Sequence, residues 1–123
     1  MTERIEKFTC ADKKFIYFDV SNFKTKEEFL EFTDSAKSII ERYEHNSVYT
    51  ITNIEGVRIS TENKKVVINW VEHNKPYVVK GAIVGVDGMK RIFINSILAL
   101  TGRKNLTFAA TREHAIGMLI KER

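Results

Sequence analysis

The sequence contains very little cysteine, proline or glycine, and it has no long hydrophobic run. The single cysteine, Cys10, excludes an intrachain disulfide and favours a reducing compartment. One proline and six glycines exclude collagen-like and linker-rich architectures. The longest apolar stretches, such as residues 82–86, fall far short of the ~20 residues that a membrane-spanning helix needs. The mixed charge of residues 1–7 predicts neither a signal peptide nor a transit segment, so we expect a cytoplasmic protein.

The remaining composition is that of a globular protein. Hydrophobic residues make up 43% of the 123 residues and charged residues 29%, which is enough apolar side chain to build a core. No internal repeat, low-complexity tract or linker interrupts the sequence. We therefore expect one domain spanning residues 1–123.

The amino-terminal part of the sequence predicts a β-hairpin followed by an amphipathic helix. Short alternations of apolar and polar residues at 4–9 and 15–20 predict the two strands, with the turn at residues 11–13. Both faces of the second strand are largely apolar, which predicts a strand inside a sheet that is covered on both sides. Thr25 and Glu28 have the spacing of a capping box, and the helix that follows is expected to run to about residue 44.

The rest of the sequence alternates between strand and helix patterns. The expected segments are a strand at 47–54, a helix at 62–74, a strand at 78–86, a helix at 89–100, a strand at 105–109 and a helix that Thr111 caps. Residues 65–71 also tolerate a strand, and the strand at 78–86 is the best candidate for a central strand. Gly102 is well placed to end the third helix.

This order of elements predicts the fold class. Strands that alternate with helices imply an α/β domain with right-handed crossovers. We expect a mostly parallel, mixed sheet of about five strands, with an antiparallel N-terminal hairpin and four helices.

Three stretches, residues 50–57, 79–89 and 108–119, give the sequence a family resemblance. They resemble, in order, a strand-turn ending in Gly-Val, an apolar strand that enters a glycine loop, and a closing strand, Thr cap and Glu-x-Ala helix. In these features and in element order the chain is similar to STAS domains, in particular to their SpoIIAA-like bacterial relatives. The resemblance implies a STAS/SpoIIAA-like fold and a non-catalytic regulatory or protein-interaction module.

The resemblance also implies a place for a phosphoacceptor. Such domains carry a phosphorylated Ser within Asp-Ser-Ser-Gly at the start of the helix after the strand-turn. Aligning on residues 56–57 places residues 61–64 there, but the Asp and Gly are missing and Glu62 falls near the acceptor position. Ser60 and Thr61 are the neighbouring hydroxyls and are therefore candidate phosphoacceptors. The alternative is that they only cap the helix.

The glycine loop after the fourth expected strand is a candidate anion or small-ligand site. Strand ends of this kind hold ligands in open α/β sheets, and a helix N-terminus attracts anions. The candidate residues are Gly85, Asp87, Gly88, Met89, Lys90 and Arg91. Their spacing matches neither nucleotide-binding glycine motif, and the alternative is a loop that only turns the chain.

No catalytic constellation, metal-ligand spacing or cofactor motif is evident. His45, His73 and His114 lie far apart in the sequence, and Cys10 has no neighbouring base. We therefore predict no catalytic residue, no metal and no cofactor. Core packing is the favoured interpretation of Trp70. If the second helix is instead exposed on one side, Asn69 and Trp70, together with His73, form an interaction patch.

Three functional hypotheses follow. The preferred one is a protein-interaction module that docks through the surface around the second helix and residues 85–91, because a family-like order of elements comes without a catalytic constellation. The uneven charge suits docking to a charged partner, since residues 25–45 carry six acidic and three basic residues whereas residues 80–104 carry five basic and one acidic. The alternative is a carrier of a small ligand, an anion or a lipid, with Phe93, Ile97 and Leu100 lining a pocket. Nucleic-acid binding ranks last and is not expected. It would use Lys90, Arg91, Arg103 and Lys104. The identity of the protein partner and the oligomeric state stay open.

Overall fold

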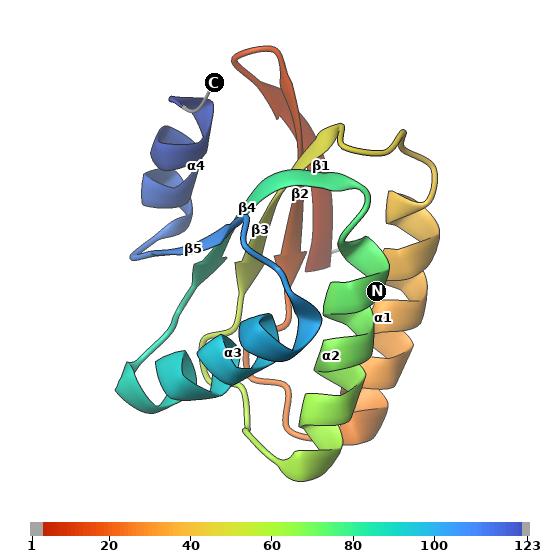
Figure 1. The fold of residues 1–123 in the computed structure, drawn as a ribbon, viewed down its shortest axis with the longest axis vertical. Coiled ribbons are helices and arrows are strands. Elements are labelled where there is room, and N and C mark those ends of the chain that lie inside the picture. Colours follow the sequence, from red (N-terminus) through yellow and green to blue (C-terminus); the bar gives the residue numbers. More distant parts are fainter. Residues whose placement is uncertain (1–3, 122–123) are drawn as a thin grey trace.

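A computed structural model describes residues 4–121 and contains the predicted order of elements (Figure 1). The elements are β1 (Ile5–Cys10), β2 (Lys13–Asp19), α1 (Lys26–Ile40), β3 (Val48–Asn53), α2 (Thr61–Asn74), β4 (Val78–Val84), α3 (Gly88–Thr101), β5 (Leu106–Ala109) and α4 (Arg112–Ile120). The fold is thus the expected α/β arrangement with a five-stranded mixed sheet.

The strands lie in the sheet in the order in which they occur in the chain. β1 pairs antiparallel with β2, and β2 to β5 are parallel to one another. β3 is therefore the middle strand. β4 lies between β3 and β5, which confirms the prediction that residues 78–86 hold a central strand.

The helices form two unequal layers. Along the chain, each new parallel strand is added to the same edge of the sheet. Because β-α-β crossovers are right-handed, the three connecting helices α1, α2 and α3 then lie on the same face. α4 follows the last strand and packs on the opposite face against β3, β4 and β5. Figure 1 shows α1 and α2 side by side on one side of the sheet and α4 on the other.

Two apolar clusters hold these layers together. On the first face, the aromatic rings of Phe18, Phe32 and Trp70 pack edge-to-face in T-shaped pairs, with ring centroids 5.1–6.2 Å apart. These rings join β2, α1 and α2. On the second face, Phe15 of β2 and Leu119 of α4 are almost fully buried in one cluster between the sheet and α4. Burial on both faces of β2 confirms the prediction of an internal strand.

The helix ends follow the local sequence signals, with one difference. The capping box is present, since the Thr25 hydroxyl accepts from the Glu28 N–H and the Glu28 carboxylate accepts from the Thr25 N–H. α1 ends at Ile40 rather than near residue 44. The N–H groups of Arg42 and Tyr43 bond to carbonyls three residues back, which tightens the last turn out of the α-helical pattern.

α3 turns inward only part of the set of residues that was expected to line a pocket, since Ile97 is buried but Leu100 is exposed. Ile94, Ile97 and Thr101 are its buried residues, whereas Met89 and Ile92 are exposed. α3 has more apolar positions than one buried stripe can use, so the pattern did not identify the inner side.

Among the described helices, none combines the length and the apolar character required to cross a bilayer.

Candidate functional site

The predicted ligand loop lies beside an open depression at the carboxyl ends of β3, β4 and β5. The depression has a volume of about 430 Å³. The residues that line it are Glu55, Gly56, Val84, Gly85, Val86, Asp87, Lys90, Ala109 and Ala110. Three of the six predicted ligand residues, Gly85, Asp87 and Lys90, are therefore brought together here.

The polar groups of this loop are already engaged in building it. Asp87 is the N-cap of α3, and its carboxylate accepts from the backbone N–H of Lys90 at 2.9 Å. The Lys90 ammonium lies 3.9 Å from the same carboxylate. The Arg91 guanidinium stacks 4.3 Å from the centre of the Phe108 ring. Since Glu55 adds a second carboxylate to the depression, the excess of positive charge that an anion site requires is reduced.

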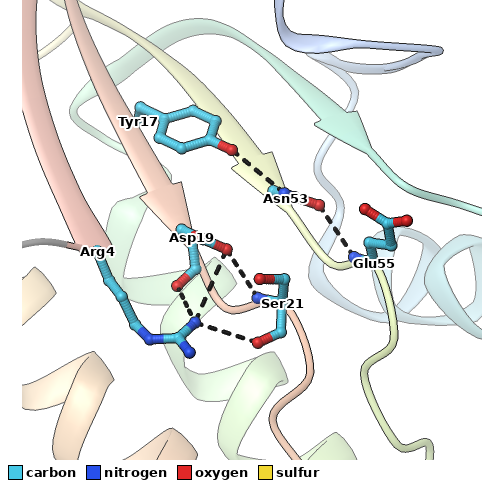
Figure 2. Close-up of polar contacts among 6 residues, drawn as sticks. All are labelled: Arg4, Tyr17, Asp19, Ser21, Asn53 and Glu55. Atoms are coloured by element: carbon cyan, nitrogen blue, oxygen red, sulfur yellow. Dashed lines mark hydrogen bonds and ion pairs between the residues drawn. The ribbon is translucent and has the colours of Figure 1, made fainter.

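β2 and β3 both end in a turn that a side chain closes by a hydrogen bond to the backbone, as Figure 2 shows. The Asp19 carboxylate accepts from the N–H of Ser21 at 2.9 Å, and the Asn53 side-chain oxygen accepts from the N–H of Glu55 at 3.0 Å. Each side chain thus closes a turn two residues further on. The Arg4 guanidinium donates to the carbonyls of Asp19 and Ser21.

Asn53 has a second contact in this region. Its amide nitrogen donates to the Tyr17 hydroxyl at 3.2 Å, from β3 to β2 (Figure 2). Both ends of the Asn53 side chain are therefore bonded to neighbouring protein groups. The arrangement explains why the chain turns here, and it leaves Asn53 a structural role.

Ser60 is the N-cap of α2. Its hydroxyl accepts from the backbone N–H of Asn63 at 3.1 Å, which confirms that Ser60 rather than Thr61 caps this helix. Thr61 is the first helical residue and is exposed. Phosphorylation of either hydroxyl stays a prediction.

The predicted patch on α2 does not form an open surface. Trp70 is only 5% exposed and packs on Phe18 and Phe32, so its inclusion in a surface patch was wrong and the core alternative holds. Asn69 accepts from the Lys37 ammonium, and His73 lies 2.7 Å from the Glu41 carboxylate. Both contacts join α2 to the end of α1. The sequence pattern predicted both helices, but it did not predict that they lie side by side.

The other histidines also have structural contacts. His114 Nδ1 accepts from the backbone N–H of Ala110, next to the Thr111 cap at the start of α4. The His45 ring packs edge-on against Tyr77. Within residues 4–121, no group of three or more His, Cys, Asp or Glu residues is arranged to hold a metal ion.

A second, narrower cavity lies between α2, α3 and the sheet, and sequence reasoning found only part of it. Phe93 and Ile97 line it as predicted, but Leu100 does not and is 66% exposed. Arg103 also lines this cavity and is 6% exposed, so it is unavailable for the surface phosphate contacts of the nucleic-acid hypothesis. No sequence signal marked Arg103 as buried, because it follows a helix end among polar residues.

Comparisons with known proteins identify the fold. No protein-family model matches the sequence, and no curated protein matches it. An uncharacterised protein of the DUF3478 family from Shewanella loihica PV-4, which has a SpoIIAA-like fold, superimposes with a TM-score of 0.71. The two sequences are 14% identical, over 94% of this chain and 91% of that one.

A second solved structure gives the same assignment. It is an anti-sigma-factor antagonist (STAS) domain protein from Planctomyces limnophilus, with a TM-score of 0.59 and 11% identity over 94% of this chain and 97% of that one. Each superposition covers nearly the whole of both chains, and this chain has the five-stranded mixed sheet and four helices of the SpoIIAA-like fold. The chain therefore has the STAS/SpoIIAA-like fold that its sequence resembles.

Proposed function

We propose that this chain is a non-catalytic, cytoplasmic regulatory module that binds a partner protein through the outer face of α3. The observation that carries this proposal is the exposure of three large apolar side chains on that helix. Met89 is 79% exposed, Ile92 is 74% exposed and Leu100 is 66% exposed. With 3.6 residues per turn, they fall within an arc of about 80°. We call these three residues the α3 outer face.

The charge around this face indicates the chemistry of the partner. The segment 80–104 has a strong excess of basic residues, and Arg91 and Lys104 in it are exposed. A partner surface with an apolar centre and an acidic rim complements this arrangement. The description of the Planctomyces limnophilus protein as an anti-sigma-factor antagonist supports a regulatory role for this fold. The structural contacts of Asn53 and the three histidines support a non-catalytic role.

The test compares two exposed apolar residues on different helices. Ile92→Glu places a charge in the α3 outer face, and Leu30→Glu is the matched control because Leu30 is a 40% exposed apolar residue on α1. A partner captured with the wild type is purified and titrated against all three proteins by calorimetry. We expect Ile92→Glu to weaken binding at least tenfold and Leu30→Glu to leave it unchanged. Binding should also weaken as salt rises.

Three outcomes would contradict this proposal. The first is failure to capture any partner, and the second is a partner that binds the Ile92→Glu variant as tightly as the wild type. The third is a concentration-dependent dimer in size-exclusion chromatography that Ile92→Glu dissociates, because the α3 outer face would then bind a second copy of the chain.

Small-ligand binding is a second candidate function, favoured by the cavity on the inner side of α3. Arg103 and Trp70, both buried, line that cavity. Control by phosphorylation at Ser60 or Thr61 is a further prediction that is compatible with either function.

A further inference from the structure

The cavity on the inner side of α3 is narrow and largely apolar. Its volume is about 80 Å³. Apolar residues from three elements form its walls, among them Val67 of α2, Ile83 of β4 and Ile97 of α3. An apolar cavity of ~150 Å³ holds one benzene molecule, so this space admits a short apolar group and excludes a long acyl chain.

A buried cation lies in the wall of this cavity. Arg103 donates from Nε to the Asn105 side-chain oxygen at 2.9 Å and from Nη1 to the Val71 carbonyl at 3.0 Å. Neither bond uses Nη2. No carboxylate of residues 4–121 lies within ion-pair distance of this guanidinium, although buried charges are ordinarily paired. Burial lowers the pKa of Arg103 to about 10, so the group stays charged at neutral pH.

A second donor in the same wall also lacks an acceptor. The Trp70 indole Nε1 is buried and has no hydrogen-bond partner in the described part of the chain. Buried polar groups of folded proteins are nearly always hydrogen-bonded. The cavity therefore combines apolar walls with two under-used donors and no competing carboxylate in its lining.

We propose that this cavity binds a small carboxylate with a short apolar body. The carboxylate would lie on the Arg103 guanidinium, whose planar set of N–H donors matches its two oxygens. The apolar body would lie along Val67, Ile83 and Ile97. This inference goes beyond docking through the α3 outer face, and it gives the second candidate function a ligand class.

Trp70 provides the readout, because it is the only tryptophan in the sequence and lines the cavity. The purified full chain is titrated with sodium propionate and, separately, with 1-propanol, while Trp70 fluorescence is recorded. We expect a saturable change with propionate and at least tenfold weaker binding of propanol. The absence of saturable binding by propionate, or equal affinity for both compounds, would overturn the proposal.

Substitutions separate this site from the docking surface. Arg103→Gln should weaken propionate binding at least tenfold, whereas Arg42→Gln, at an exposed arginine after α1, should leave it unchanged. Ile92→Glu alters only the outer face and should also leave it unchanged. Failure of the docking proposal and failure of this one are therefore distinguishable.

A measurement on the wild type keeps the proposal testable if Arg103→Gln does not fold. Methyl NMR spectra are recorded with and without propionate. We expect shifts at Val67, Ile83 and Ile97, and none at Ile51 or Leu119, which lie in the core cluster on the α4 side of the sheet. Shifts confined to the α4 side, or spread evenly over both clusters, would refute the assignment.

Discussion

At the scale of single residues, two glycines are required because another part of the chain lies too close to leave room for a side chain. Gly85 is the sharpest case, because its φ of +87° lies in the left-handed region and a Cβ there would lie 2.7 Å from the Glu55 backbone nitrogen. The loop after β4 and the turn after β3 thus approach each other more closely than any side chain allows. A similar approach, at Gly56, involves the flexible end of the Asn22 side chain.

Gly85→Ala should therefore lower the free energy of unfolding by at least about 2 kcal/mol, through left-handed strain and the contact with Glu55. Gly117→Ala is the matched control, since a Cβ at this α4 position has nothing within 4 Å. The control should raise the free energy of unfolding by up to about 1 kcal/mol, because alanine favours helices over glycine. Urea denaturation measures both. Equal effects of the two substitutions would contradict the packing described for Gly85.

Glu28 predicts a pH dependence of stability. Its carboxylate accepts from the backbone N–H groups of Lys24 and Thr25, and these bonds lower its pKa from the ordinary value of 4.5. A carboxyl whose pKa is lower in the folded state stabilises the fold above pH 4.5 and loses that contribution as the pH falls through the folded pKa. Glu28→Gln should thus lose less stability than the wild type between pH 6 and pH 3, as measured by the urea midpoint.

Glu27→Gln is the control for this prediction. Glu27 is an exposed neighbour in the same helical turn, and its carboxylate accepts no hydrogen bond from the described residues 4–121. Its variant should follow the pH profile of the wild type. A Glu28→Gln profile parallel to that of the wild type would show that the capping carboxylate does not contribute to acid unfolding.

At the scale of elements, the helix caps explain why the order of elements could be predicted. Thr25, Ser60 and Thr111 mark helix starts by local hydrogen bonds that depend on a few neighbouring residues. The orientation of α3 could not be predicted in the same way. Its sequence offers apolar residues on more than one side, and only contact with the sheet and α2 selects Ile94 and Ile97 as the inner residues.

The candidate site shows the same division between local and distant information. Sequence reasoning placed Gly85 and Lys90 correctly at a strand end, because a strand followed by a glycine loop is a local pattern. It missed the buried state of Arg103, whose partners include the Val71 carbonyl 32 residues away. It favoured the core for Trp70, but it could not show that the neighbouring α1 covers this side chain.

Ser60 allows the role of a cap to be measured. Ser60→Ala should lower the free energy of unfolding by about 1 kcal/mol, because the Asn63 N–H loses its acceptor. Ser60→Asp should keep most of the stability, since aspartate is an equally good N-cap residue. Thr61→Ala, at an exposed helical position, is the control and should be close to neutral. Thermal unfolding followed by circular dichroism distinguishes these outcomes, and a neutral Ser60→Ala would refute the cap.

At the scale of the whole molecule, the sequential order of the strands leaves the two faces of the sheet unequally covered by helices. Three helices cover one face, and the shorter α4 covers part of the other. Arg112 of α4 bridges the gap to the hairpin, since its guanidinium lies 4.3 Å from the centre of the Tyr17 ring and donates to the Glu6 carboxylate at 2.9 Å. Contacts of this kind tie the last helix to the first strands.

This closure predicts that residues 1–123 unfold as one cooperative unit. Trp70 reports on the cluster between β2, α1 and α2, whereas far-ultraviolet circular dichroism reports on all helices, including α4. The two signals should therefore give the same urea midpoint and slope, as two-state unfolding requires. Arg112→Gln should lower the midpoint of both signals together. A dichroism transition that precedes the Trp70 transition would instead mean that α4 unfolds separately from the rest of the sheet, and the molecule would not be a single cooperative domain.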